Sequence, residues 1–113
     1  MQIEIGSDHS IQVHDEWAGK LEEMVQHALR HHRDQLTRVV LHLSDENAHK
    51  AGDNDKRCAM EGRLRGMQPV AVTHHGDTFD KAAAGAADKL SRLLEHTLAK
   101  ASAKRPPPPP AVE

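Results

Sequence analysis

Aromatic residues are almost absent from this sequence of 113 residues, which contains one tryptophan, one phenylalanine and no tyrosine. Proteins that bind single-stranded nucleic acids by stacking the bases need exposed aromatic rings. Trp17 and Phe79 each fall on the apolar side of a predicted helix, so the sequence offers no ring for that purpose. Any nucleic-acid binding by this chain must therefore use phosphate groups and shape.

Cysteine and long apolar runs are also scarce. Cys58 is the single cysteine, which excludes an internal disulfide and is typical of a protein in a reducing cytosol. The N-terminal stretch MQIEIGSDHS is too polar for a secretion signal, and no apolar run approaches the ~20 residues that span a membrane. We therefore expect a cytoplasmic protein with no membrane partner.

The sequence has no excess of positive charge. Its net charge is −2 when the ten histidines are counted as neutral, with 37% hydrophobic and 28% charged residues. These values are ordinary for one soluble globular domain with a modest core. An acidic chain of this kind binds nucleic acids only through local clusters of cations, so the distribution of lysine and arginine decides the matter.

Catalytic motifs are missing as well. The sequence contains no glycine-rich phosphate loop, no paired-cysteine motif and no serine nucleophile elbow. Cys58 falls on the inward side of a predicted strand, and Glu61, on the outward side, has no acidic partner within reach in the sequence. We therefore expect no enzyme activity, no cofactor and no small-molecule substrate.

The histidines leave one alternative open. His27 and His31 are spaced i, i+4 on a predicted helix, a spacing that can place two ligands on one metal ion. His74 and His75 are adjacent in a predicted strand and must point to opposite sides. There is no HExxH motif. We expect exposed histidines and no metal site, with a histidine-based metal-binding protein as an alternative.

Periodicity predicts two helices and four strands. Residues 2–6, 36–45, 56–65 and 69–75 alternate apolar and polar side chains, which is typical of strands with one buried face. Residues 15–32 and 77–102 have the helical period, and Asp15 and Asp77 are the predicted N-caps. The order β-α-β-β-β-α predicts an α+β fold, a two-layer sandwich in which both helices cover one face of a four-stranded, mostly antiparallel sheet.

The chain divides into two regions. We expect residues 1–102 to form one domain and residues 103–113, which include five consecutive prolines, to form a disordered tail. A proline run of this kind is extended and cannot bury enough apolar surface to form a core.

The predicted helix at 77–102 has two contrasting sides. Its apolar residues recur at helical spacing and form one stripe: Phe79, Ala83, Ala87, Leu90, Leu94 and Leu98. The opposite side carries most of the cations, diluted by Asp88 and Glu95 at its edge: Lys81, Lys89, Arg92, His96 and Lys100. Such a side is either a solvated helix surface or a surface for an anionic partner.

Three stretches of the sequence resemble a known family: the opening MQIEI, the passage LRHHRDQLTRVVLHL, and above all AAAGAADKLSRLLEHTL. Together they resemble the ribosome hibernation-promoting factors, a family that includes the ribosome-associated inhibitor protein Y and is also known as the sigma modulation proteins. The resemblance covers residues 1 to about 100 in the same order of elements. Asp88-Lys89-Leu90 matches the DKL signature of the family, and the chain resembles its short form.

This resemblance implies a stress or stationary-phase protein of bacteria. Members bind the small ribosomal subunit in the channel for messenger and transfer RNA and block translation by occupancy. The basic positions that match the family are Lys89 and Arg92, so the resemblance implies that these contact ribosomal RNA. We expect Lys81, His96 and Lys100 to extend the same contact, with Lys20 and Arg30 as further candidates on the first helix. We expect a monomer when free. The alternative from another class is a protein-interaction module that uses the open sheet face and the proline tail.

Overall fold

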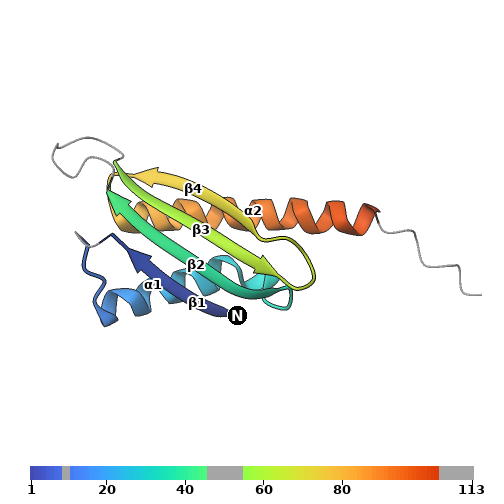
Figure 1. The fold of residues 1–113 in the computed structure, drawn as a ribbon, viewed down its shortest axis with the longest axis horizontal. Helices are drawn as coiled ribbons and strands as arrows, with labels where there is room; N and C mark the ends of the chain where they lie inside the picture. Colours follow the sequence, from blue (N-terminus) through green and yellow to red (C-terminus); the bar gives the residue numbers. More distant parts are fainter. Residues whose placement is uncertain (9–10, 46–54, 105–113) are drawn as a thin grey trace, which may run out of the picture.

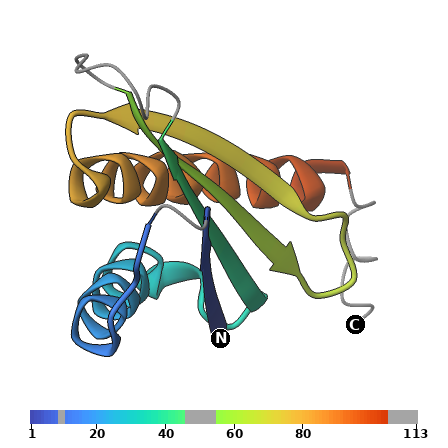
Figure 2. The ribbon, with the colours of Figure 1, turned by 60° about the vertical axis from the view of Figure 1, so that its left-hand side comes forward.

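A computed structural model describes residues 1–8, 11–45 and 55–104 of the chain. The described elements, in order, are β1 (Gln2–Ser7), α1 (Asp15–Ala28), the 3₁₀ turn η1 (Arg30–His32), β2 (Leu36–Asp45), β3 (Lys56–Leu64), β4 (Val70–Gly76) and α2 (Phe79–Lys104). Figure 1 looks at the sheet, with both helices behind it, and Figure 2 shows the same two layers from the side. The predicted two-layer α+β fold is confirmed.

The four strands lie in chain order in one mixed sheet. β1 pairs with β2 in parallel, with Ile3 opposite Val39, and α1 makes the crossover between them. The pairs β2–β3 and β3–β4 are antiparallel, so Met60 lies between Leu41 and Val72. The apolar positions of adjacent strands therefore line up on the helix side of the sheet, and the opposite side is left open.

The core lies between the sheet and the helices. The strands contribute apolar side chains from alternate positions, and both helices contribute one stripe each. The buried residues are Leu21, Val25, Leu29, Leu36, Val39, Leu41, Leu43, Cys58, Met60, Leu64, Ala82, Ala83, Ala86, Ala87, Leu90 and Leu94. The central residues of the predicted stripe of α2 are buried, as expected, whereas Phe79 and Leu98 at its two ends are only half-buried. Ala82 and Ala86 are also buried, so the buried stripe is wider than predicted.

Both predicted N-caps are wrong by one residue. The N-cap of α1 is His14, and no side chain caps this helix. At the start of α2 the Thr78 hydroxyl accepts a hydrogen bond from the Lys81 amide at 3.1 Å, whereas Asp77 pairs with the Lys81 ammonium. Threonine and aspartate side chains can both cap the first amides of a helix, and where they are adjacent the backbone geometry of the turn decides which of them does so.

The ends of the elements also differ slightly from the prediction. The predicted helix at 15–32 divides into α1 and the tighter turn η1, because the chain must reverse before β2. α2 runs to Lys104, two residues past the predicted domain end. The rest of the predicted tail, 105–113, lies outside the described residues.

Helix α2 is held against β4 by a close approach at Gly85. A Cβ atom on this glycine would lie 2.0 Å from Cδ2 and 2.2 Å from Nε2 of His74, a residue on the helix side of β4. The absence of a side chain at Gly85 therefore lets the helix backbone rest on the imidazole ring. This contact fixes how far the following turns of α2 stand from the edge of the sheet.

Candidate nucleic-acid interface

The cations of α2 are held on its exposed side by the burial of its stripe. Since Ala83, Leu90 and Leu94 face the core, residues about half a turn away must face solvent. The structure describes all five predicted side chains of this side as exposed: Lys81, Lys89, Arg92, His96 and Lys100. We call this set the basic side of α2.

Two cations of the basic side are paired with carboxylates one turn before them. Lys81 Nζ lies 3.2 Å from Asp77 Oδ1, and an Arg92 guanidinium nitrogen lies 3.1 Å from Asp88 Oδ2. Both cationic side chains remain largely exposed, at 70% and 78%. Exposed i, i+4 pairs contribute only about 0.3–0.5 kcal/mol. A phosphate can therefore replace these carboxylates at little cost.

Lys89 takes a different direction from Arg92. Its ammonium donates a hydrogen bond to the Thr73 carbonyl of β4 at 3.0 Å. β4 is an edge strand of the sheet, so this lysine covers part of an edge that would otherwise present an unpaired acceptor. The basic side of α2 thus extends sideways to the β4 edge of the sheet.

The structure does not bring Lys20, one of the two predicted residues of the first helix, to this surface. Lys20 lines a hollow of about 280 Å³ between the helices, together with Met24, Asp80 and Ala84. In the same groove the Trp17 indole donates to Asp80 Oδ1 at 2.7 Å. Ala84 and Asp80 face α1, whereas Lys89 reaches β4 on the other side of α2.

Arg30 lies in η1, where its guanidinium donates to the His27 carbonyl at 2.7 Å. It therefore belongs to the end of the sheet at which β2 begins.

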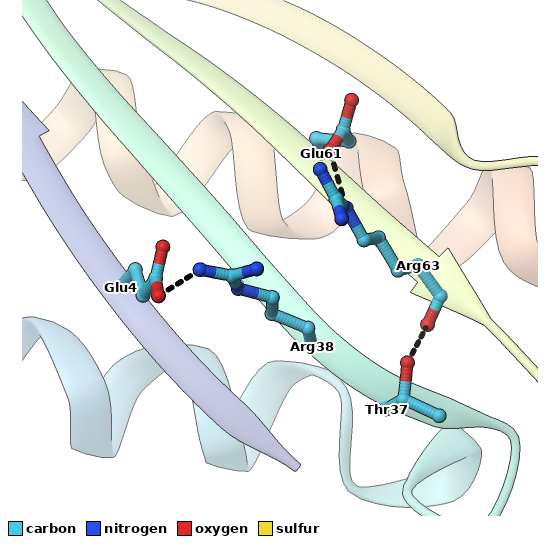
Figure 3. Close-up of polar contacts among 5 residues, drawn as sticks. All are labelled: Glu4, Thr37, Arg38, Glu61 and Arg63. Carbon is cyan, nitrogen blue, oxygen red and sulfur yellow. Dashed lines mark hydrogen bonds and ion pairs between the residues drawn. The ribbon is translucent and has the colours of Figure 1, made fainter.

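The open face of the sheet carries arginines that the site prediction left out. Arg38 on β2 and Arg63 on β3 are register partners on this face, and Figure 3 shows both side chains. Arg38 pairs with Glu4 of β1, and Arg63 Nε lies 3.1 Å from Glu61 Oε1. Alternation along residues 36–45 places Arg38 on the outward side, which is the signal that could have found it.

The histidines of the described part of the chain do not gather into a metal-binding cluster, and Cys58 is buried. Among residues 1–8, 11–45 and 55–104, no three His, Cys, Asp or Glu side chains lie close enough together to hold a metal ion. Burial raises the pKa of the Cys58 thiol to about 11, partly opposed by the Arg57 charge. The described helices include none that is both long and apolar enough to cross a membrane.

Two solved structures share this fold. One is the N-terminal domain of Protein Y from Thermus thermophilus, with a TM-score of 0.67 and 19% identity over 86% of this chain and 99% of that chain. The other is a ribosomal subunit interface protein from Coxiella burnetii, with a TM-score of 0.72 and 15% identity over 88% of this chain and 99% of that one. No protein-family model and no curated protein sequence matches the chain. The likeness is therefore one of fold, and it agrees with the resemblance seen in the sequence.

Proposed function

We propose that this protein is a short hibernation-promoting factor that binds the small ribosomal subunit and inhibits translation by occupying the channel for messenger and transfer RNA. The observation that carries the proposal is the fold, which covers nearly the whole of two solved chains, one a Protein Y domain and the other a ribosomal subunit interface protein. A cytoplasmic protein that acts by occupancy needs no catalytic group and no cofactor.

The basic side of α2 is the proposed contact with ribosomal RNA. Its cations stand on a rigid helix whose opposite side is anchored in the core, so they are held in a fixed pattern. Ammonium and guanidinium groups at helical spacing can bind successive phosphates of a backbone. With its scarce aromatic rings the protein binds phosphates and shape, and base sequence matters little.

Cosedimentation with ribosomes at low and at high salt tests the proposal. We expect wild-type protein to sediment with the small subunit at low salt and to dissociate as salt is raised. A wild-type protein that stays in the supernatant at low salt refutes the function. A protein that binds equally at both salt concentrations refutes phosphate contacts as the source of affinity.

A double variant locates the contact on α2. Lys89→Glu with Arg92→Glu should abolish association, because two attractive contacts become repulsive. The milder pair Lys89→Gln with Arg92→Gln should weaken binding and make the slope of log K against log salt shallower by about 1.4–1.8. Its matched control is Gln12→Glu with Gln26→Glu, two exposed positions where the same change in net charge should leave binding nearly intact. If the Lys89→Gln, Arg92→Gln variant binds as tightly as this control variant, the basic side of α2 is excluded from the interface.

A further inference from the structure

Arginine is concentrated at one end of the sheet. Five of the eight arginines in the sequence lie in η1, in the turn that follows it, near the start of β2, at the end of β3 and directly after β3. We call this group the arginine end: Arg30, Arg33, Arg38, Arg63 and Arg65. Residues 30–38 and 61–65 contain no lysine, so the long cationic side chains of these segments all carry the planar guanidinium group.

The fold brings these residues together from three segments. Arg38 and Arg63 face each other across β2 and β3, and a bulge between Leu36 and Arg38 separates the first inward residue of β2 from the next. The Arg65 amide donates to the Gln35 carbonyl at 2.9 Å, and the Gln35 amide donates to His32 in η1 at 3.1 Å. These backbone bonds place the end of β3 beside the turn that carries Arg30 and Arg33.

The arginine end retains uncompensated charge. Arg38 and Arg63 are paired with Glu4 and Glu61. Within the part of the chain that the structure describes, the exposed Arg33 and Arg65 side chains make no ion pair. The segments 30–38 and 61–65, with Glu4 that pairs with Arg38, contain five arginines and three acidic residues, Glu4, Asp34 and Glu61.

We propose that the arginine end is a second RNA contact, which binds phosphates through Arg33 and Arg65 and extends to Arg38 and Arg63. The inference rests on the proposed function, since it identifies a further surface of the same interface. Guanidinium forks bind phosphate in a bidentate manner and are weakly hydrated, so clustered arginines suit an RNA backbone better than scattered lysines. Their planes can also stack on unpaired bases, in place of the missing aromatic rings.

The two contacts lie on different faces of the molecule: Arg38 and Arg63 stand on the open face of the sheet, and α2 packs on the other face. Lys89 is bound to Thr73, whose register partner Ala59 lies four residues before Arg63 on β3. Four residues of strand correspond to about 13 Å. Lys89 is therefore offset along the sheet from Arg63, while the C-terminal turns of α2 reach the arginine end, where Thr97 lines a hollow with Gly66, next to Arg65. Because the two contacts lie on different faces, we expect them to meet different stretches of RNA.

The test measures affinity over a range of salt for two probes, naked small-subunit ribosomal RNA and intact small subunits. The variant is Arg33→Gln with Arg65→Gln. Both side chains are exposed and make no hydrogen bond or ion pair with the described residues, so the fold should be preserved; circular dichroism checks this. We expect binding to both probes to weaken about tenfold or more, with a salt slope shallower by about 1.4–1.8. The control Gln12→Glu with Gln26→Glu changes the net charge equally and should bind nearly as wild type does.

A second variant separates charge from geometry. Arg33→Lys with Arg65→Lys keeps both charges, so it should keep the wild-type salt slope while losing affinity, because lysine cannot bind phosphate in a bidentate manner. If this variant binds as wild type does, bidentate recognition is excluded.

Each remaining outcome has one meaning. Suppose that the wild-type protein binds and that the glutamine variant binds with the same affinity and the same salt slope. The arginine contact is then overturned, and the proposed function is left intact. Loss of binding to intact subunits with unchanged binding to naked RNA shows that the arginine end meets a ribosomal protein, which also overturns the inference. Wild-type protein that binds neither probe overturns the proposed function itself.

Discussion

The contact between Gly85 and His74 predicts that Gly85→Ala destabilises the protein, whereas the same substitution at Gly19 stabilises it. Alanine usually stabilises a helix by about 1 kcal/mol relative to glycine. At Gly85, however, the new Cβ would lie 2.0 Å from the imidazole of His74, so the ring or the helix must move. On α1, Gly19 has no atom within 4 Å of the position that its Cβ would take, which makes Gly19→Ala the matched control.

The magnitude follows from these distances. Overpacking of a well-packed site costs about 1–3 kcal/mol, and such a short approach belongs at the upper end of that range. After the gain in helix propensity, Gly85→Ala should be less stable than wild type by about 2 kcal/mol. For a domain of this size the melting temperature should fall by about 8–16 °C, whereas Gly19→Ala should raise it by about 4–8 °C.

Thermal unfolding followed by circular dichroism measures both variants. Combining Gly85→Ala with His74→Ala supplies the further control, because removal of the ring leaves room for the new methyl group. In that background we expect Gly85→Ala to be neutral or stabilising. If Gly85→Ala in the wild-type background raises the melting temperature as much as Gly19→Ala does, the helix does not rest on His74 and the reasoning is wrong.

Three further predictions concern other parts of the molecule. Glu61→Gln removes the carboxylate that pairs with Arg63, so it should strengthen RNA binding and steepen its salt dependence; weaker binding in filter assays would count against the arginine end. Cys58 is fully buried and its pKa is raised to about 11, so Ellman's reagent at pH 8 should leave it unmodified in the native protein. After denaturation one thiol should react, and a rapid reaction of the native protein would show that β3 opens readily. Deletion of residues 105–113 should leave the melting temperature within error, because a proline run buries little surface; a clear fall would mean that the tail packs on the domain.

The fold could be predicted from the sequence because its periods are unambiguous. In β2, Val39, Leu41 and Leu43 alternate with more polar neighbours, and the structure buries these three while leaving the intervening positions on the open face. Alanine was harder to place: Ala82 and Ala86 are buried beside the leucine stripe, but alanine is common on both sides of helices. The N-caps failed for a similar reason, because neighbouring polar residues compete for the same amide.

The candidate site could be predicted only where it lies on one element. The basic side of α2 follows from the helical period alone. The arginine end depends on which residues of β2 and β3 are opposite each other, and this register is set across a connection of ten residues, between Asp45 and Lys56, and by the bulge at the start of β2. Periodicity gives the outward direction of Arg38 and Arg63 but not their distance, so the cluster became visible only in the folded chain.

The parallel pairing of β1 has a consequence for the order in which the chain folds. Gln2 and its partner Arg38 are thirty-six positions apart in the chain, whereas Gly62 and Val70 of the β3–β4 hairpin are only eight apart. Pairing of distant segments carries the larger loss of chain entropy, so the hairpins and α2 should form first and β1 should join last. β1 and β4 are the two edge strands, but β4 is held by its contacts with α2 at His74 and Thr73, so β1 should be the first to detach and its amides should exchange with solvent fastest among the strands. The N-terminal strand thus closes the sheet during folding and is the place from which it begins to open.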